Sequence, residues 1–354
     1  VIMSNHSKAN KKISEVDVII LGVGTSGEDL SHQLIDNGLK VIGVEPNLVG
    51  GECPYWACLP SKMMIRTTNA LQESRRVENL AGHVKLTPDW KPLAERIHGL
   101  TAGWDDSAAV ERFEKSGGKL IKGNGKLTGP RTVTVGDESY KARIGVVIAT
   151  GSKPSIPPIP GLSGLDYWTT RDVIQLKELP ESMIIIGGGS SGCELGQVLA
   201  RFGVEVTIVE AGDRLLSAEE PEASEVLKDA FTSEAIKVEV GKSAKRIDSH
   251  DGTFAVTLAD GNKLTAERLF VATGREVDLN GLGLESVGLD GQANFIQVDE
   301  RMRAGEGIWA MGDVTGKALF THVALYQSAI IASEILGKEH PPAQYHAIPR
   351  GTFT

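Results

Sequence analysis

The segment Gly22-Val23-Gly24-Thr25-Ser26-Gly27 decides the fold, because it is a glycine-rich turn between an apolar strand and a helix. The strand is predicted over residues 17–21 and the helix to about residue 37, and a second strand over 41–44 ends at Glu45. In such a unit the glycines let the backbone approach a pyrophosphate at the helix N-terminus, and the carboxylate accepts hydrogen bonds from a ribose. The pattern predicts a Rossmann-like dinucleotide-binding unit.

The same pattern occurs a second time around Gly187-Gly188-Gly189-Ser190-Ser191-Gly192. A strand over 183–186 precedes this turn, and a helix to about 202 and a strand over 204–209 lead to Glu210. In both copies the acidic residue follows the first glycine by 23 positions (22 to 45 and 187 to 210). Two complete copies predict an α/β fold with two nucleotide-binding units. The alternative for each copy is a glycine-rich turn that holds no ligand.

The segments between and after the two copies fit the same plan. Apolar strands that end in Ala-Thr-Gly, at 149–151 and 272–274, are expected to close the two units. A helical stretch near 222–235 and short alternating strands from 237 to 264 precede the second of them. Near the end, a short apolar strand leads into Gly312-Asp313, and a helical pattern runs from about 321 to 336. Asp313 is a candidate cofactor contact, and the alternative is a plain turn at a strand end.

Composition excludes several classes of function. A net charge of −9 without a concentrated basic patch argues against nucleic acid as a partner. No apolar run approaches the roughly 18 residues of a membrane span, and residues 1–15, an expected disordered tail with His6, lack the apolar stretch of a signal peptide. We therefore expect a cytoplasmic protein that does not bind membranes. In the cytoplasm a cysteine pair is more often catalytic than structural.

Two of the three cysteines, Cys53 and Cys58, lie in the run Gly50-Gly51-Glu52-Cys53-Pro54-Tyr55-Trp56-Ala57-Cys58-Leu59-Pro60-Ser61-Lys62. Residues five apart on an ideal helix have Cα atoms roughly 8 to 9 Å apart, whereas a disulfide needs less than about 7 Å. A bond between them would require a distorted first turn, with Pro54 at the first helical position and Cys53 near the cap. The helix N-terminus would favour a thiolate there. The alternatives are two unrelated core cysteines and half of a metal site; we expect no metal.

Together these motifs resemble the flavoprotein disulfide reductase family, which contains dihydrolipoamide dehydrogenase, glutathione reductase and mercuric reductase. The resemblance covers about residues 16–354. It implies two Rossmann-like domains of three-layer ββα type, with the FAD domain split by an inserted NAD(P) domain. The implied boundaries are 16–160 and 279–340 for the FAD domain, 161–278 for the NAD(P) domain, and 341–354 for the start of a dimerisation domain.

The resemblance also implies the site residues. Catalytic roles fall to Cys58 as the thiol nearest the flavin, Cys53 as the interchange thiol and Lys62 near the flavin N5. FAD would be held by Gly22, Gly24, Thr25, Ser26, Gly27, Glu45, Pro46, Gly50, Gly51, Glu52, Lys62, Gly125, Ala149, Thr150, Gly151, Ser152, Gly312, Asp313, Leu319, Phe320, Thr321 and His322. The nicotinamide nucleotide would be held by Gly187, Gly189, Ser190, Ser191, Gly192, Glu194, Glu210 and Gly274.

The implied reaction passes electrons from NAD(P)H through flavin to a Cys53–Cys58 disulfide and on to a disulfide-type acceptor. NADH is favoured over NADPH, because the Glu210 carboxylate would accept a hydrogen bond from a ribose 2′-hydroxyl and repel a 2′-phosphate. The positive charge of Arg214, four residues later, is the feature that opposes this preference. Two alternatives stay open. One is a flavin-dependent quinone reductase or diaphorase in which the cysteines are spectators, and the other is a nucleotide-binding redox sensor without catalysis.

Three features depart from the family pattern or lie outside it. Tyr55 and Trp56 stand where relatives carry small or aliphatic residues; they either pack in the core or offer a stacking surface for a planar acceptor such as a quinone. Cys193, at the start of the second fingerprint helix, is expected to be buried and inert.

The third feature is the C-terminus. Residues 348–354 look like the first strand of the dimerisation domain, so a longer protein is expected to be a homodimer. The resemblance implies that the dimerisation domain supplies a catalytic His-Glu pair to the partner's active site, and His340 and His346, in a proline-rich linker, are not expected to replace it.

Overall fold

The computed structural model describes residues 14–354, and these form two compact units. The expected tail with His6 lies almost entirely outside the described residues. The first unit contains residues 14–51, 105–152 and 277–348; the second contains 52–104, 153–276 and 349–354. Residues 52–104, expected in the FAD domain, are thus grouped with the inserted nucleotide domain, and the boundaries fall after 152 and 276 instead of 160 and 278.

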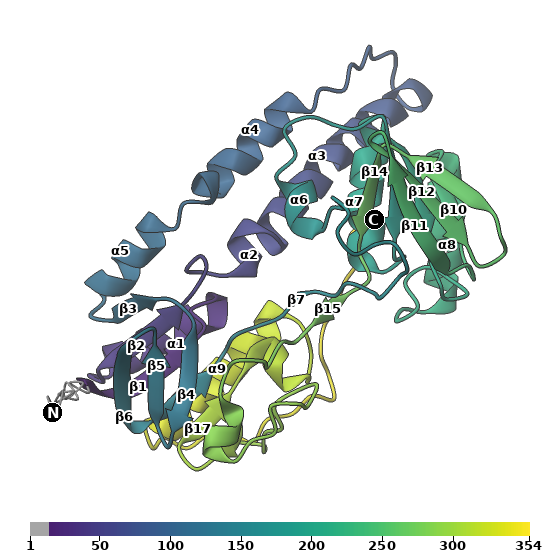
Figure 1. Ribbon diagram of the computed structural model, residues 1–354. Coiled ribbons are helices and arrows are strands. Elements are labelled where there is room, and N and C mark those ends of the chain that lie inside the picture. Colours follow the sequence, from purple (N-terminus) through teal and green to yellow (C-terminus); the bar gives the residue numbers. More distant parts are fainter. Residues whose placement is uncertain (1–13) are drawn as a thin grey trace, which may run out of the picture. The chain divides into compact units, whose positions relative to one another are not determined.

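The first unit is built on a sheet with the order β16-β17-β6-β1-β2-β3, to which the hairpin β4–β5 is added through β6. Figure 1 labels β17 and the strands β1 to β6 of this sheet. Strands β1, β2, β3, β6 and β17 are parallel, whereas β4, β5 and β16 pair antiparallel with their neighbours. The strands are β1 (Ser14–Leu21), β2 (Val41–Glu45), β3 (Lys119–Lys122), β4 (Gly125–Gly129), β5 (Thr132–Val135), β6 (Glu138–Ile148), β16 (Arg303–Gly305) and β17 (Ile308–Ala310).

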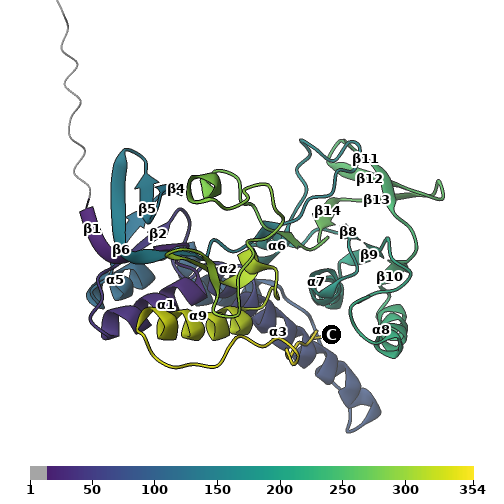
Figure 2. The same ribbon diagram turned by 90° about the horizontal axis from the view of Figure 1, so that it is seen from below.

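Alternate residues of β1 face opposite sides of this sheet. Val18 and Ile20 are buried in the cluster that contains Leu30 of the helix α1 (Thr25–Asp36) and Ile331 of the helix α9 (Thr321–Ile335). Ile19 and Leu21 are buried on the other side with residues of β4, β5 and the turn η3 (Leu284–Val287). Helices α1 and α9 lie side by side on one face (Figure 2). The remaining helical elements are α5 (Ser107–Lys115), which contacts β3, and η4 (Gly312–Thr315).

The second unit contains a parallel sheet with the order β10-β9-β8-β14 and an antiparallel sheet β11-β12-β13. A short two-stranded ribbon, β7–β15, is also part of it. The strands are β7 (Lys153–Pro154), β8 (Ser182–Ile186), β9 (Glu205–Val209), β10 (Lys237–Glu239), β11 (Ala244–His250), β12 (Thr253–Leu258), β13 (Lys263–Ala266), β14 (Arg268–Val271) and β15 (Arg275–Glu276). The helical elements are α2 (Glu52–Tyr55), α3 (Cys58–Arg76), η1 (Val77–Asn79), α4 (Lys91–Leu100), η2 (Ala102–Trp104), α6 (Thr170–Ile174), α7 (Ser190–Arg201) and α8 (Pro221–Ser233).

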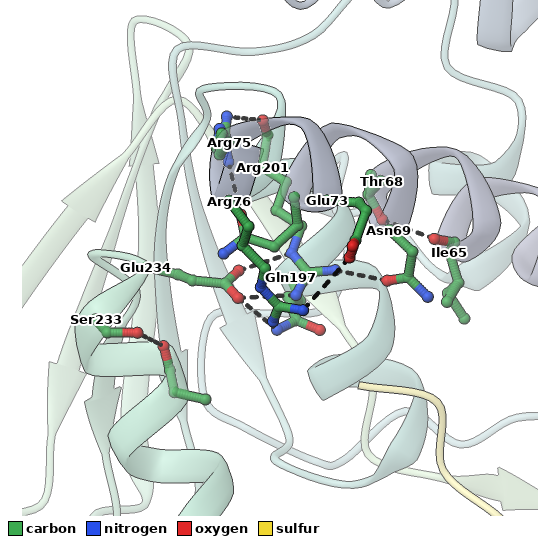
Figure 3. Close-up of polar contacts among 12 residues, drawn as sticks. Ile65, Thr68, Asn69, Glu73, Arg75, Arg76, Gln197, Arg201, Ser233 and Glu234 are labelled. Atoms are coloured by element: carbon green, nitrogen blue, oxygen red, sulfur yellow. Dashed lines mark hydrogen bonds and ion pairs between the residues drawn. The ribbon is translucent and has the colours of Figure 1, made fainter. Parts of the chain in front are cut away.

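Helix α3 belongs to this unit because one stripe of its surface is buried there. Met64 and Ile65 lie in a hydrophobic cluster with residues of α4, α7 and the parallel sheet. Farther along α3, Asn69 accepts a hydrogen bond from Arg201 of α7, whose guanidinium also pairs with Glu234 after α8 (Figure 3). Sequence order alone did not indicate this grouping.

The predicted strands and helices of both fingerprint units are confirmed within one or two residues at most ends. The strand expected over 348–354 is absent: that part of the described chain has no strand. Among residues 14–354, none of the helices combines the length and apolar character needed to cross a bilayer.

Candidate functional site

A cavity of about 530 Å³ lies in the second unit at the carboxyl ends of β8, β9 and β14. This edge of a parallel sheet is where α/β folds bind nucleotides. The cavity is lined by residues 187–191 of the second glycine-rich turn, by Glu210, by Gly274 and by Lys242. Of the residues expected to hold the nicotinamide nucleotide, Gly192 and Glu194 are not among its lining residues. A side chain on Gly189 would meet no atom within 4 Å, so this turn leaves open space beside the backbone.

Glu210 closes one side of this cavity and is fixed by backbone donors. Its Oε2 accepts a hydrogen bond from the N–H of Gly188 at 2.6 Å, and its Oε1 accepts one from the N–H of Gly212 at 2.6 Å. A Cβ on Gly188 would lie 3.0 Å from the Cβ of Glu210, so only glycine allows this close approach. Gly187 has φ +114°, and a Cβ there would lie 2.4 Å from the carbonyl oxygen of Ala272.

Two positively charged side chains close to Glu210 in the sequence or in the cavity, Arg214 and Lys242, form hydrogen bonds and ion pairs with other residues. Arg214 donates from Nη2 to the carbonyl oxygens of Ser217 (2.7 Å) and Glu219 (3.2 Å) in its own loop. Lys242 pairs with Glu239 at 2.7 Å and with Asp260 at 3.1 Å, and these hydrogen bonds raise its pKa. The sequence did not single out Lys242 or these acidic partners.

The glycine-rich turn of the first unit repeats this geometry. Glu45 accepts hydrogen bonds from the N–H of Val23 and the N–H of Asn47, both at 2.8 Å. Its carboxyl group is buried, and burial raises its pKa even though both backbone hydrogen bonds oppose that change. Gly24 bridges to Gly50, and Thr25 donates a hydrogen bond to the Gly50 carbonyl at 3.0 Å. The turn and the residues before the cysteines are therefore joined in the first unit.

Other residues expected to hold FAD gather in the same unit. Ser152 donates a hydrogen bond to Asp313, and the N–H of Gly312 donates to the buried Gln327 at 2.6 Å. Phe320 and His322 stack with ring centroids 5.3 Å apart at the start of α9. Leu319 and Phe320 are each more than one third exposed.

Gly125 has a packing reason for its small size. A Cβ on Gly125 would lie 2.6 Å from the Leu21 side chain and 3.0 Å from that of Val44. Its assignment to FAD stays a prediction, as do those of Pro46, Ala149, Thr150, Gly151 and Thr321.

The cysteine segment is distorted as expected, but the distortion is a break between two helices. Cys53 is the second residue of the four-residue helix α2, and Cys58 is the first residue of the 19-residue helix α3. Ala57, between them, has φ −132° and ψ −100°, outside the helical region. Cys53 therefore lies near the N-terminus of its own short helix, as expected, and Cys58 holds the N-terminal position of the long helix, which favours a thiolate. Both cysteines are half-buried.

Lys62 and Glu194 form an ion pair of 2.8 Å in the second unit, with the Glu194 side chain only 6% exposed. The second oxygen of Glu194 accepts a hydrogen bond from the N–H of Phe353 at 2.9 Å, and the Lys62 Nζ lies 4.8 Å from the centre of the Phe353 ring. The sequence assigns Lys62 to the FAD site and Glu194 to the nicotinamide nucleotide, and it does not predict that the two side chains form an ion pair.

Two arginines beside the cysteines were also missed. Arg171 pairs with Glu52 and lies over the ring of Trp56, with Cζ 4.4 Å from the ring centre. Arg275 also pairs with Glu52, at 3.6 Å. Tyr55 is buried and tilted against Trp56, with ring centroids 5.8 Å apart. The aromatic pair therefore packs within this unit, and Arg171 covers one face of the ring expected as a stacking surface.

Cys193 is fully buried, as predicted, and donates to the carbonyl oxygen of Gly188 at 3.3 Å. Burial, with smaller contributions from Glu210 and Glu194, raises the pKa of its thiol to about 12. It is therefore a neutral core residue at physiological pH. Among residues 14–354, no group of three or more His, Cys, Asp and Glu side chains could hold a metal ion.

Both glycine-rich turns fit a dinucleotide. Each turn contains a glycine, Gly24 or Gly189, beside which there is space for a ligand because the residue has no Cβ. Each turn also has a carboxylate that accepts hydrogen bonds from two backbone N–H groups. These features suit a pyrophosphate at the helix N-terminus and a ribose beside the carboxylate.

Comparison with known proteins agrees with this geometry. Residues 16–330 match the family described as pyridine nucleotide-disulphide oxidoreductase. The chain is 34% identical over 353 residues to a dihydrolipoyl dehydrogenase of Chlorobaculum parvum, covering 96% of this chain and 74% of that protein. It is 29% identical to a mercuric reductase of Staphylococcus aureus, covering 99% and 65%.

Among solved structures, LpdA of Mycobacterium tuberculosis matches with a TM-score of 0.85 and 26% identity, covering 97% of this chain and 76% of that one. The chain thus spans about two thirds to three quarters of the length of these relatives. On the extent of the family match and these identities, the chain belongs to the pyridine nucleotide-disulphide oxidoreductases, a family of enzymes that use FAD and a pyridine nucleotide.

Proposed function

We propose that this protein passes electrons from NADH to a disulfide-type acceptor by way of bound FAD and a redox-active Cys53–Cys58 pair. The observation that carries the proposal is the placement of the two cysteines on either side of a helix break, with Cys58 at the N-terminus of α3. That position favours the thiolate, which is the form that attacks a disulfide.

Residues of this chain would have separate tasks in this reaction. FAD would be held by the first glycine-rich turn and Glu45, and when bound it would supply the hydride and electron chemistry. Lys62 would be held in one orientation by its ion pair with the buried Glu194 in the second unit. Cys53 would attack the acceptor as a thiolate, and Cys58 would displace the reduced product by forming the intramolecular disulfide.

NADH is the proposed electron donor because of the charges around the nucleotide cavity. The Glu210 carboxylate is fixed at the cavity by two backbone N–H groups, where it would accept hydrogen bonds from a ribose and repel a 2′-phosphate. Arg214, whose positive charge could attract a 2′-phosphate, donates hydrogen bonds to two carbonyl oxygens of its own loop. Lys242 is neutralised by Glu239 and Asp260.

The variant Glu210→Gln tests this donor preference. We expect the ratio of kcat/KM for NADH to that for NADPH to fall by at least about tenfold, because the charge that repels the 2′-phosphate is removed. Steady-state kinetics with both nucleotides measure the ratio. Glu205→Gln is the matched control, since it removes the same charge at the opposite, exposed end of β9 and should leave the ratio unchanged. An unchanged ratio in Glu210→Gln would refute the role of Glu210.

An acceptor screen tests the reaction class. The FAD-loaded protein is mixed with NADH and with lipoamide, glutathione disulfide, mercuric ion or a quinone, and NADH oxidation is followed at fixed acceptor concentration. We expect turnover with at least one disulfide or with mercuric ion, which the names of the relatives indicate. Turnover with quinones alone would replace the proposal by the quinone reductase alternative. No turnover with any acceptor, despite bound FAD and NADH, would favour a redox sensor.

A further inference from the structure

We propose that Arg171 is a positioning residue for the redox cysteines: its guanidinium holds Glu52, the residue directly before Cys53, and Trp56, the residue directly after the short helix α2. This inference rests on the proposed function, because it assigns a role to Arg171 in the Cys53–Cys58 couple. The cluster formed by Glu52, Trp56, Arg171 and Arg275 is called the Arg171 clamp below.

The clamp holds the short helix α2 at its beginning and just beyond its end. Arg171 donates from Nε and Nη2 to Oε1 of Glu52, the residue directly before Cys53; the Nε distance is 3.0 Å. The same guanidinium lies 4.4 Å from the ring centre of Trp56, which directly follows α2. The other oxygen of Glu52 pairs with Arg275 at 3.6 Å. Arg171 thus contacts the first residue of the helix that carries Cys53 and the residue that follows this helix.

The clamp is mounted on elements that cannot easily shift. Arg171 is the second residue of α6, whose N-terminus is closed by a reciprocal capping box between Thr169 and Asp172. Val173 and Ile174 of α6 are buried in the core of the second unit. Arg275 lies in β15, which directly follows the nucleotide-binding turn at Gly274 and pairs with β7. These anchors give the guanidinium a fixed position relative to the sheet.

Helix α2 needs such support because it is too short to be stable by itself. A helix of four residues forms almost none of the backbone hydrogen bonds that stabilise longer helices. The non-helical Ala57 interrupts the backbone between α2 and α3, so the position of Cys53 relative to Cys58 depends on side-chain contacts, of which the Arg171 clamp is one. A disulfide requires Cβ atoms about 3.5 to 4.5 Å apart, so restraint of Cys53 raises the effective concentration of one thiol at the other.

The clamp should therefore stabilise the disulfide form of the couple. The relevant exchange is the reaction of the Cys53–Cys58 disulfide with two glutathione thiols, which gives the protein dithiol and one glutathione disulfide. A looser α2 makes the intramolecular disulfide less favourable, and the equilibrium moves toward the dithiol. An arginine that only stabilised the fold would leave this equilibrium unchanged, so the two roles are separable.

The test measures the fraction of Cys53–Cys58 disulfide in FAD-loaded protein across a series of glutathione redox buffers. Acid quenching, alkylation and peptide mass spectrometry report the two thiols directly. We expect Arg171→Leu to shift the equilibrium constant about tenfold toward the dithiol, which corresponds to about 30 mV. Arg171→Lys keeps a charge for Glu52 but loses the planar fork and the stack, so we expect a smaller shift of about threefold.

The chain supplies a matched control. Arg268, the first residue of β14, also lies over a tryptophan, with Cζ 5.5 Å from the ring centre of Trp168. Within the described part of the chain, neither residue forms a hydrogen bond, ion pair or ring stack with Glu52 or Trp56. Arg268→Leu removes the same kind of contact and should leave the equilibrium within twofold of the parent protein. Should Arg171→Leu fail to fold, Trp56→Leu removes the stack while leaving the Glu52 ion pairs, and it is expected to shift the equilibrium in the same direction.

The outcomes separate this inference from the proposed function. If the parent protein forms the disulfide but a folded Arg171→Leu matches it within twofold, the positioning role is wrong and the proposed function is unaffected. If Arg171→Leu and Arg268→Leu shift the equilibrium equally, the effect belongs to the unit as a whole and the positioning role is also wrong. If the parent protein forms no Cys53–Cys58 disulfide in any buffer, the proposed function itself fails.

Discussion

Replacing Cys58 with serine is expected to lower the turnover of a disulfide acceptor by at least about a thousandfold. A serine hydroxyl is not ionised at neutral pH and cannot form a disulfide, so the variant lacks the group that resolves the adduct on Cys53. Cys58 is also the residue whose thiolate the N-terminus of α3 would favour. NADH oxidation in the presence of the best acceptor from the screen measures the loss.

The other two cysteines make this experiment specific. Cys53→Ser should lose disulfide turnover to the same extent, because it removes the attacking thiol. Cys193→Ser should keep it, because that thiol is buried and its raised pKa, about 12, keeps it neutral. Reduction of a quinone by NADH is expected to survive in all three variants. If Cys53→Ser and Cys58→Ser both retain disulfide turnover, the cysteines are spectators. That result would contradict the proposed disulfide reductase and favour the quinone reductase alternative.

The parts of the structure that could be predicted from sequence are those encoded locally. A glycine turn between a strand and a helix, with an acid at a fixed distance, needs only about 25 consecutive residues to be recognised. Both copies fold as predicted, and in each the carboxylate accepts hydrogen bonds from equivalent N–H groups, those of Val23 and Asn47 or of Gly188 and Gly212. The buried state of Cys193 follows from the same periodicity.

What the sequence did not predict depends on contacts between distant residues. Arg171 is 119 positions from Glu52, and Arg201 is 132 positions from Asn69, so no local pattern joins them. The sequence predicts one helix with a distorted first turn in the cysteine segment, whereas the structure has two helices separated at Ala57. Alanine favours helices, so its residue type gives no sign of this break. Packing between distant residues also places residues 52–104 in the second unit.

The buried ion pair of Arg201 and Glu234 gives the largest expected effect on stability. Both side chains are about nine-tenths buried, and the guanidinium donates from Nε and Nη2 to the two carboxylate oxygens at 2.8 Å (Figure 3). Gln197 also donates to Glu234 at 3.1 Å. Glu234→Gln leaves a buried guanidinium without its counterion. We expect the free energy of unfolding of the second unit to fall by about 3 to 5 kcal/mol, measured by urea denaturation.

A double variant distinguishes the loss of the ion pair from the cost of leaving one buried charge without its counterion. Arg201→Met with Glu234→Leu removes both charges, so it should recover most of the stability that Glu234→Gln loses. Glu205→Gln breaks the exposed pair with Lys237 in the same unit and should leave the urea midpoint unchanged. A double variant as unstable as Glu234→Gln would contradict the electrostatic explanation.

The outcome also bears on the cysteines, because Arg201 holds α3 through Asn69. Since Cys58 begins α3, loss of the ion pair would weaken one contact of the helix that carries it, the hydrogen bond to Asn69. The Arg171 clamp holds Cys53 from the opposite side of the helix break. Glu234→Gln should therefore weaken the contact of Arg201 with α3 and leave the contacts of Arg171 with Glu52 and Trp56 in place.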